Sequence, residues 1–286
     1  MAITIDSAFV QQFKDNVVHL AQQSDTRLRP TVREEPLTGE ALNIDRLGQT
    51  DSIEKTAARV ATPFVDSPWS RRVATPKTFH WADTFEQEDK VKMLIDPQNA
   101  YAQNCGMSMR RAIDDLLIAS ARADALDGDG VAVPLPGANT LGGATQKLDY
   151  SNVLEMQDFL HSGDVDPDDE RCWVLSPSAV KELLNDDKII NSDYQKLNML
   201  LTNGVVSSIF GGKAILSNRL ESAGAGRTYN MCYTMDALCL GVNQDMMFRV
   251  NERDDLSYLI QVYAAWTMAA TRVEDEKIVF FDHDDA

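Results

Sequence analysis

The stretch that decides the fold reads Tyr258-Leu-Ile-Gln-Val-Tyr-Ala-Ala-Trp-Thr-Met-Ala-Ala-Thr-Arg272-Val-Glu274-Asp275-Glu276-Lys277-Ile-Val-Phe-Phe281. A strongly apolar run passes through Ala-Thr-Arg-Val into an acidic turn and then into a four-residue apolar strand. Its counterpart is a long helix predicted near the middle of the chain. Asp96 is a suitable cap, Pro97 suits the first helical position, and the pattern continues to Leu126 before the glycines of 127–130 end it. Such a helix spans roughly 45 Å, which is long for a globular domain.

Two segments precede this helix. Residues 1–30 predict a helical arm that ends at Arg27-Leu-Arg-Pro30, because apolar side chains recur near helical spacing without a local partner. Residues 31–90 are rich in Pro and Gly and contain no long periodic element, which is unusual inside a compact domain. Aromatic residues such as Trp69 and Phe79 argue against disorder there. We interpret 31–90 as an extended two-stranded arm that gains its burial from neighbours.

The second half of the chain alternates helices with strands, so the predicted class is α+β. A helix is expected from Ser151 or Asn152 to about Leu160, closed by Gly163, with Glu155 completing a capping box. The other expectations, listed in chain order, are a buried strand at 171–175, a helix capped by Ser176 with Pro177 first, a helix near 192–202, two strands joined at Gly211-Gly212, and β-like runs over 229–242.

Composition narrows the classes of function. The chain has 286 residues, 44% hydrophobic and 25% charged, and a net charge of −17. Such an acidic chain is a poor candidate for gripping nucleic acid, although it can surround it. Four cysteines lack CxxC spacing and are interpreted as small buried thiols in a reducing compartment: Cys105, Cys172, Cys232 and Cys239. Met1-Ala-Ile-Thr-Ile-Asp6 does not resemble a signal peptide, and no apolar run reaches the length of a membrane helix.

Motifs for catalysis or ligand binding do not emerge from the sequence. The histidines lack metal-ligand spacing and are interpreted as surface or structural residues: His19, His80, His161 and His283. The acidic run from Asp164 to Glu170 resembles a calcium loop but has Asp169 and Leu175 where such a loop needs Gly and Glu, so a solvated turn is preferred. We therefore predict no catalytic, cofactor-binding or metal-binding residues and no enzyme.

Four stretches in series resemble the tailed-phage major capsid protein family, whose fold is named after phage Hong Kong ninety-seven. Residues 1–90 are similar to its N-arm and extended E-loop, and the helix after Asp96-Pro97 to its spine helix. The pattern from Trp173 through Gly211-Gly212 to Ser217 resembles its axial domain, and 270–279 its closing strand. Each motif alone is weak, but the four cover most of the chain in the right order.

The resemblance implies a division into an N-terminal arm (1–30), an E-loop (31–90), a peripheral domain with the spine helix (91–150 and 256–286) and an axial domain (151–255). It implies a structural subunit of an icosahedral virion capsid, assembled in the host cytoplasm as hexamers and pentamers around double-stranded DNA. Implied partners are further copies of the chain, a portal and a separate scaffolding protein, without sequence-specific DNA binding or a membrane. Two alternatives stay open: an encapsulin-like shell that stores a cargo enzyme, and a soluble α+β enzyme.

Two charged features fit a shell subunit. Arg46, Arg71 and Arg72 are candidates for bidentate pairs with carboxylates of a neighbouring subunit, and the alternative is that they face solvent. Under the first hypothesis, charge reversal at Arg71 and Arg72 leaves the monomer folded but weakens assembly. Residues 274–285 hold six acidic residues against Lys277 and would repel packed DNA, or simply act as a solubilising terminus.

Overall fold

The computed structural model describes residues 22–86, 97–143, 145–186, 200–202, 205–209, 211–224 and 226–285. The chain forms two compact units. Among the described residues, unit 1 holds 22–25, 78–86, 97–111 and 246–266, and unit 2 holds the remainder. The helix α2 (Pro97–Arg122) and the strands β14 (Leu238–Arg253) and β15 (Leu259–Arg272) each begin in one unit and end in the other.

The predicted long helix is confirmed as α2, which has 26 residues and a length of about 39 Å. It ends four residues earlier than expected, because the chain turns at Ala123-Asp124 into the short strand β5 (Ala125–Asp127). The proposed cap, Asp96, lies outside the described residues. Apolar residues of α2 at helical spacing are buried: Cys105, Met109, Ile113, Leu116 and Leu117.

Unit 1 contains a sheet edge formed by β4 (Lys77–Phe85) beside β15. The full four-stranded sheet has the order β1-β14-β15-β4. Phe85, Ile260 and Val262 form a small buried cluster, and Phe85 stacks on Tyr101 of α2 with ring centroids 5.6 Å apart. The hairpin between β14 and β15 carries the short helix η5 (Asp254–Leu256), followed by two residues with positive φ, Ser257 and Tyr258.

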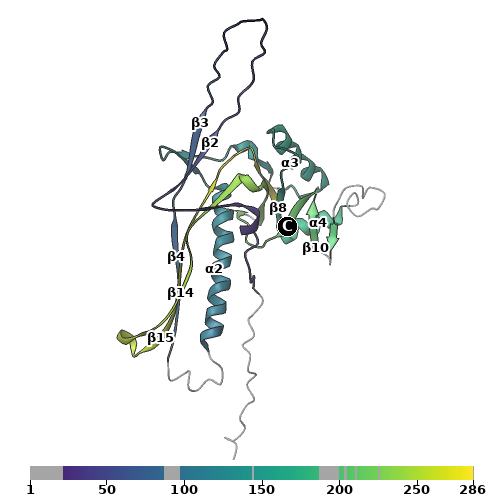
Figure 1. Cartoon of the computed structure of the whole chain (residues 1–286). Coiled ribbons are helices and arrows are strands. Elements are labelled where there is room, and N and C mark those ends of the chain that lie inside the picture. Colours follow the sequence, from purple (N-terminus) through teal and green to yellow (C-terminus); the bar gives the residue numbers. More distant parts are fainter. Residues whose placement is uncertain are drawn as a thin grey trace, which may run out of the picture. The chain divides into compact units, whose positions relative to one another are not determined.

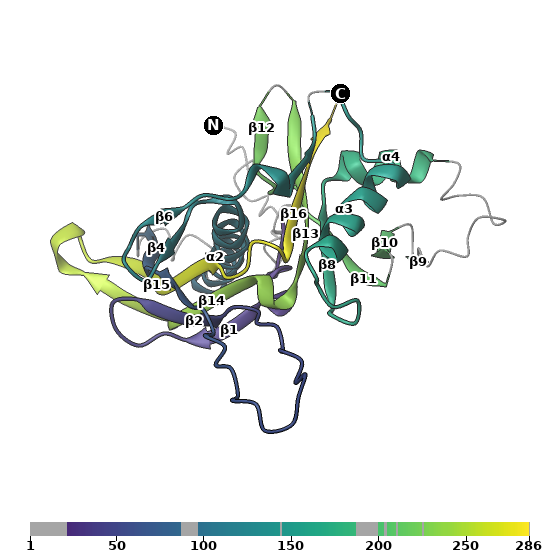
Figure 2. The same cartoon turned by 90° about the horizontal axis from the view of Figure 1, so that it is seen from above.

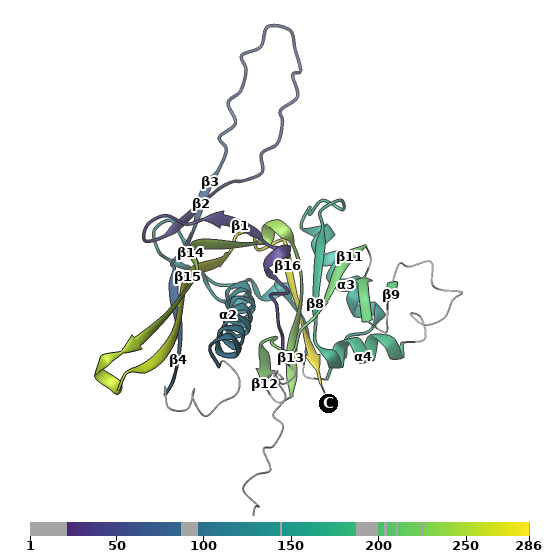
Figure 3. The same cartoon turned by 60° about the horizontal axis from the view of Figure 1, so that its bottom comes forward.

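Unit 2 is built on an eight-stranded sheet (Figure 3). Seven of its strands have the order β7-β16-β13-β8-β11-β10-β9, and the eighth, β12, pairs with β13. Its strands, in chain order, are β7 (Thr140–Gly142), β8 (Arg171–Leu175), β9 (Leu200–Thr202), β10 (Val205–Ile209), β11 (Gly212–Leu216), β12 (Ser222–Gly224), β13 (Arg227–Thr234) and β16 (Ile278–Asp284). The central strand β8 is buried along its whole length, as its apolar sequence predicts.

Two helices cover one face of this sheet, α3 (Tyr150–Ser162) and α4 (Pro177–Asn185) (Figure 2). They enclose the main core around Trp173, which is fully buried with Leu160, Leu183, Val279 and Phe281. The larger core lies here because strands from four parts of the chain place alternate side chains toward these helices.

Side-chain oxygens cap the N-termini of α3 and α4. Ser176 accepts a hydrogen bond from the Ala179 N–H at 3.2 Å, and Pro177 takes the first position of α4, as predicted. The capping box predicted for α3 is wrong. The cap is Asp149, whose carboxylate accepts the N–H of Asn152 at 2.8 Å, because an aspartate two to three residues earlier supplies a stronger acceptor.

The segment 31–90 contains strands β1 (Arg33–Pro36), β2 (Leu42–Leu47), β3 (Trp69–Ala74) and β4, after the short helix η2 (Arg29–Thr31). β2 and β3 pair antiparallel, and the chain between them extends as a long hairpin (Figure 1). β3 also pairs antiparallel with β5, and β5 pairs with β6 (Ala132–Val133). Unit 2 therefore holds a second sheet of order β2-β3-β5-β6. The pairing of β2 with β3 confirms two strands within the predicted arm, and the burial of this arm against neighbours stays a prediction.

Several local predictions need correction. Residues 200–202 of the predicted helix 192–202 form β9 instead, and 192–199 lie outside the described residues. In the predicted arm helix, 1–21 lie outside the described residues and 22–28 are not helical. The buried carboxylate of Asp114 in α2 accepts the N–H groups of Arg27 and Leu28 at 3.0 and 3.2 Å. These two hydrogen bonds hold the segment beside α2. The chain between β5 and α3 contains β6, η3 (Gly137–Asn139) and β7.

The turn between β10 and β11 is confirmed, and it generates a stability prediction. Gly212 lies so close to β8 that an added Cβ would be 2.8 Å from both Trp173 Nε1 and the Arg171 carbonyl oxygen. Gly212→Ala is expected to lower the free energy of unfolding by about 1–3 kcal/mol, because neither the backbone nor a core tryptophan can move away freely. Gly143→Ala, where no heavy atom lies within 4 Å of the new Cβ, is the matched control for urea unfolding. Equal stability of the two variants would contradict this packing.

Candidate functional site

The described part of the chain offers no group of three or more His, Cys, Asp or Glu side chains that could hold a metal ion, and none of its helices is long and apolar enough to cross a membrane. The acidic run from Asp164 forms a turn in which Asp166 accepts the N–H of Asp168 at 3.0 Å. His80 is exposed, His161 contacts Arg171 at 2.9 Å and His283 is buried, while His19 lies outside the described residues.

The cysteines are free and buried, as the sequence predicts. Burial raises the pKa of Cys105 to about 11 and that of Cys239 to about 12, and it raises the pKa of Cys232 well above its usual value. Thiols with such pKa values hold little reactive thiolate at neutral pH. These cysteines are packing residues.

The feature that distinguishes unit 2 is the hairpin of β2 and β3. Every residue from Leu47 to Arg71 is exposed, including Phe64, whose side chain is 97% exposed. The other large apolar side chains exposed on the hairpin are Leu47, Ile53, Val60, Val65 and Trp69. An apolar surface of this kind marks a protein interaction site, because leaving it in water has no structural benefit to the subunit.

Strand alternation decides the environment of each arginine at the root of the hairpin. Residues 42, 44 and 46 of β2 face the interior, as do 72 and 74 of β3. Asp45 and Arg71 therefore lie on the exposed face, where they are direct cross-strand partners with Arg71 Nε 2.6 Å from Asp45 Oδ1. Arg72 points inward, and only 3% of its side chain is exposed.

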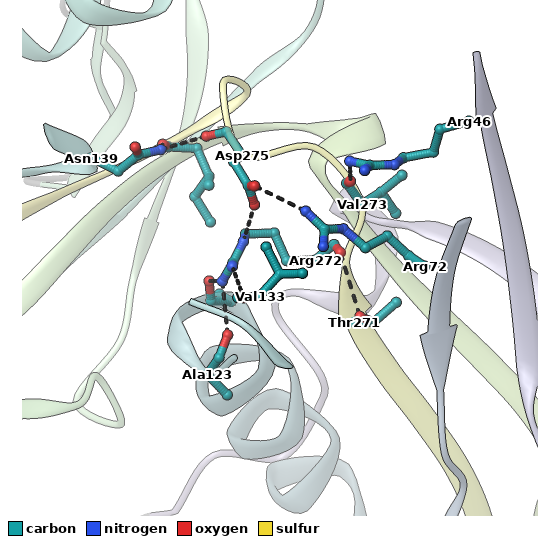
Figure 4. A network of polar contacts seen from close by, with 11 residues as sticks. Arg46, Arg72, Ala123, Val133, Asn139, Thr271, Arg272, Val273 and Asp275 are labelled. Carbon is teal, nitrogen blue, oxygen red and sulfur yellow. Dashed lines mark hydrogen bonds and ion pairs between the residues drawn. The ribbon is translucent and has the colours of Figure 1, made fainter. Parts of the chain in front are cut away.

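Behind the root lies a polar cluster of Arg46, Arg72, Asn139, Arg272 and Asp275 (Figure 4). The Asp275 carboxylate joins two guanidinium groups: Arg272 Nε lies 2.5 Å from Oδ1, and Arg72 Nη2 lies 2.9 Å from Oδ2. The carbonyl oxygens of Asp275 and Ile278 accept hydrogen bonds from the Asn139 amide at 2.5 and 2.9 Å. The acidic turn after β15 is thereby fixed from both sides.

Arg272 is fully buried and connects this turn to the end of α2. Its Nη1 donates to the carbonyl oxygens of Ala121 and Ala123 at 3.2 and 2.8 Å, and its Nη2 donates to Val133 at 3.2 Å. The last carbonyls of a helix have no intrahelical donor and carry the negative end of the helix dipole, so a guanidinium satisfies both. One side chain thus joins β15, α2 and β6.

Positive charge exceeds negative charge in the cluster. Burial lowers the pKa of Arg72, nearby Arg46 and Arg272 lower it further, and Asp275 and Asp127 act in the opposite direction. Arg46 donates from Nη1 to the Val273 carbonyl at 2.6 Å, and no carboxylate among the described residues lies within ion-pair distance of it. The guanidinium groups of Arg72 and Arg272 therefore share the carboxylate of Asp275, and the charge of Arg46 lies near them without a carboxylate of its own among the described residues.

These contacts correct the arginine hypothesis. Arg71 has its carboxylate partner within the same strand pair, and Arg72 has one in its own chain, so neither faces a neighbour unpaired. Charge reversal at Arg72 would place a carboxylate against Asp275, so from this contact we expect the Arg72 variant to be less stable than the wild type. Of the three candidates, Arg46 alone keeps a half-exposed side chain without a carboxylate among the described residues.

The acidic closing segment is also corrected. Asp275 belongs to the buried cluster, and Asp282, which is 7% exposed, is paired with Arg227 Nη1 at 2.5 Å. β16 is buried along most of its length. Residues 274–285 are thus neither a free solubilising terminus nor an evenly acidic surface.

Sequence reasoning missed the cluster itself. It named neither Arg272 nor Asp275 as site residues, although a signal was present. An arginine inside an apolar strand, followed three residues later by an aspartate, requires a buried counter-charge. The partners Ala121, Val133 and Asn139 carry no such signal, because two of them act through backbone carbonyls.

Comparison with known proteins agrees with this architecture. A sequence model of the family described as phage capsid protein matches residues 5–285. The structure is similar to the capsid proteins of cyanophage P-SCSP1u (12% identity, TM-score 0.75, 100% of this chain and 96% of that one) and cyanophage Pam1 (12%, 0.74, 100% and 100%). It is also similar to the capsid of Ralstonia phage GP4 (10%, 0.71, 99% and 98%). No curated individual protein matches the sequence significantly.

The fold is that of the phage capsid proteins, and the α+β prediction is confirmed. The chain belongs to the phage capsid protein family, because the family model matches nearly its whole length. It is a structural protein of the virion head, and the enzyme alternative is set aside.

The cluster generates a stability prediction. Asp275→Asn leaves the buried Arg72 and Arg272 without their counter-charge, so the free energy of unfolding is expected to fall by about 3–5 kcal/mol. Asp45→Asn, which breaks the exposed pair with Arg71, is the matched control and should have little effect, because solvent screens that pair. Thermal unfolding of the unassembled subunits measures both variants. Similar melting temperatures would show that Asp275 does not stabilise the fold.

Proposed function

We propose that this subunit assembles into the hexamers and pentamers of an icosahedral head around double-stranded DNA, and that the hairpin of β2 and β3 reaches onto a neighbouring copy. The observation that carries the proposal is the continuous exposure of 47–71 together with its apolar side chains. A subunit that stays alone would leave this surface in water. In a closed shell each copy both donates and receives one hairpin, so one contact is repeated throughout the shell.

The energetic scale of this contact is modest for each residue. Burying one large apolar side chain contributes about 1.5–3 kcal/mol before the entropy of ordering the hairpin is subtracted. Phe64 and Trp69, which are 97% and 73% exposed, are the aromatic residues of the hairpin with the most surface available for burial. Weak individual contacts that act together suit a shell, since subunits must be able to dissociate from incorrect positions during assembly.

The four-part division predicted from the resemblance remains our proposal, with one revision. We assign 1–30 to the arm, 31–90 to the E-loop segment, 91–150 to the peripheral domain and 151–255 to the axial domain. The revision concerns 256–286, which the resemblance assigns to the peripheral domain. Within it, β16 pairs with β13 from Arg227↔Asp284 to Tyr233↔Ile278, which supports placing 278–284 with the axial domain. The two compact units divide the chain differently, with their boundaries inside α2, β14 and β15.

A portal and a separate scaffolding protein are proposed as partners in the host cytoplasm. The acidic balance of the chain supports a wall that encloses DNA without holding its phosphates, because phosphate contacts require basic patches. Membership of the phage capsid family supports a genome-containing head over a cargo-storing shell. Negative-stain microscopy with sedimentation, followed by analysis of the shell contents, tests both points. A monomer or dimer at high concentration, even with a co-expressed scaffold, would contradict the assembly.

The hairpin predicts a variant that folds but does not assemble. Phe64→Asp is expected to leave the melting temperature unchanged and to reduce the yield of closed shells by at least about tenfold, because a carboxylate cannot be buried in the contact. Val131→Asp is the matched control, since Val131 is 60% exposed outside the hairpin. Sedimentation measures the assembled fraction. Normal shells from the Phe64 variant would exclude it as an anchor.

Substitution of Arg46 by glutamate is expected to preserve or raise the stability of the subunit and to slow its assembly. Arg46→Glu places a carboxylate beside the excess positive charge of Arg72 and Arg272, so the subunit is expected to be at least as stable as the wild type. If Arg46 receives a carboxylate of a neighbouring copy, the same variant assembles more slowly and the salt dependence of assembly weakens. Light scattering at several salt concentrations measures this. Unchanged assembly would assign Arg46 to the cluster alone.

A further inference from the structure

His283 lies at the end of β16 with no exposed side-chain surface. Its Nδ1 accepts the backbone N–H of Leu148 at 3.0 Å. An imidazole nitrogen accepts a hydrogen bond only when it carries no proton, so this contact requires the neutral ring with its proton on Nε2. The geometry therefore fixes both the charge and the tautomer of His283.

Among the described residues, the other ring nitrogen has no hydrogen-bond partner. Nε2 is buried, and the closest carboxylate oxygen is Asp285 Oδ1 at 3.9 Å, which is too long for a hydrogen bond. A second proton on the ring would convert Nδ1 into a donor that faces the Leu148 N–H. Protonation would thus break the existing contact and place a charge in a buried site.

The contact joins two segments far apart in sequence. Leu148 is fully buried in the main core and is followed by Asp149, the cap of α3. The adjoining residues of the last strand are held by backbone bonds, from Asp284 N–H to the Gln146 carbonyl at 2.9 Å and from Asp285 N–H to the Gly226 carbonyl at 3.0 Å. Of these three contacts to the last strand, only the one to Leu148 is made through a titratable side chain, that of His283.

We propose that His283 is an acid-sensitive latch, which holds the end of β16 to the segment 145–149 while the ring is neutral and releases it when the ring takes up a second proton. Release would loosen the start of α3 and the last strand first, while the central strand β8 stays in place. The latch would make acid tolerance of the subunit depend on one side chain.

The charged groups around the ring set the direction of the effect. Burial lowers the pKa of His283 and outweighs the opposing attraction of Asp285, Glu182 of α4 and Asp284, while Lys147 lowers the pKa further. On β13, the residue opposite His283 is the uncharged Thr228, and the neighbouring Arg227 is paired with Asp282. The unfolded chain therefore binds the proton more readily than the folded chain. Stability is lost as the pH falls below the ordinary histidine pKa of about 6.5.

His283→Asn tests the latch. The asparagine amide oxygen can accept the Leu148 N–H but does not titrate between pH 5 and 8. The drop in melting temperature between pH 7.5 and pH 5.0 is expected to be smaller than in the wild type by about 2–4 °C. His80→Asn, at an exposed histidine, is the matched control and should keep the wild-type drop. Equal drops in all three proteins would overturn the proposal.

A second measurement covers the case in which His283→Asn does not fold. In the full-length wild-type protein, amide exchange of peptides over 145–150 and 280–285 should increase on the order of tenfold from pH 7.5 to pH 5.5, after correction for the intrinsic effect of pH on exchange. A peptide over 171–175 in β8 should not change. Unchanged protection of 145–150 would contradict the latch.

Discussion

The Asp275 carboxylate between Arg72 and Arg272 is the contact on which the hairpin, the end of α2 and the closing strand all depend. The Asp275 side chain is 16% exposed and accepts from two guanidinium groups, so it is held more firmly than an exposed pair, because less solvent competes for its oxygens. Through Arg272 it reaches the last carbonyls of α2, and through Arg72 it reaches β3. The turn that carries Asp275 leads directly into β16, so the same residue sets where the last strand enters the main sheet.

Burial of this kind has a high desolvation cost, which well-packed apolar residues would avoid. The charged cluster instead provides hydrogen bonds of defined geometry. Guanidinium groups donate in a fixed plane, so the three arginines restrict how β2, β3 and the turn at Asp275 meet. We propose that the exposed hairpin meets a neighbour, and for that contact a rigid root would define the angle better than a root of interchangeable aliphatic contacts.

The sequence predicts elements with strong local signals and fails where long-range contacts decide. Pro97, Ser176-Pro177 and Gly211-Gly212 mark boundaries by backbone chemistry, and the structure has elements there. The α3 cap was misassigned because Asp149 and Asn152 are both good caps and only the fold selects between them. Residues 200–202 became a strand because pairing with β10 overrides their helical pattern. The fates of Arg71 and Arg72 could not be predicted separately, since a shift of one residue in strand register would exchange them.

At several positions of this chain, burial is opposite to what hydropathy predicts. Phe64 and Trp69 lie in water, whereas Arg272 and His283 are completely buried. An exposed aromatic side chain and a buried charged or polar side chain each reduce the stability of the isolated subunit. Arg272 has a partner inside the chain in Asp275, and His283 has one in Leu148 through Nδ1, while His283 Nε2 has none among the described residues. The exposed apolar groups of 47–71 have none among the described residues. Polar groups that are satisfied internally stabilise one fold, while apolar groups left unsatisfied favour association, and a capsid protein needs both in a single chain.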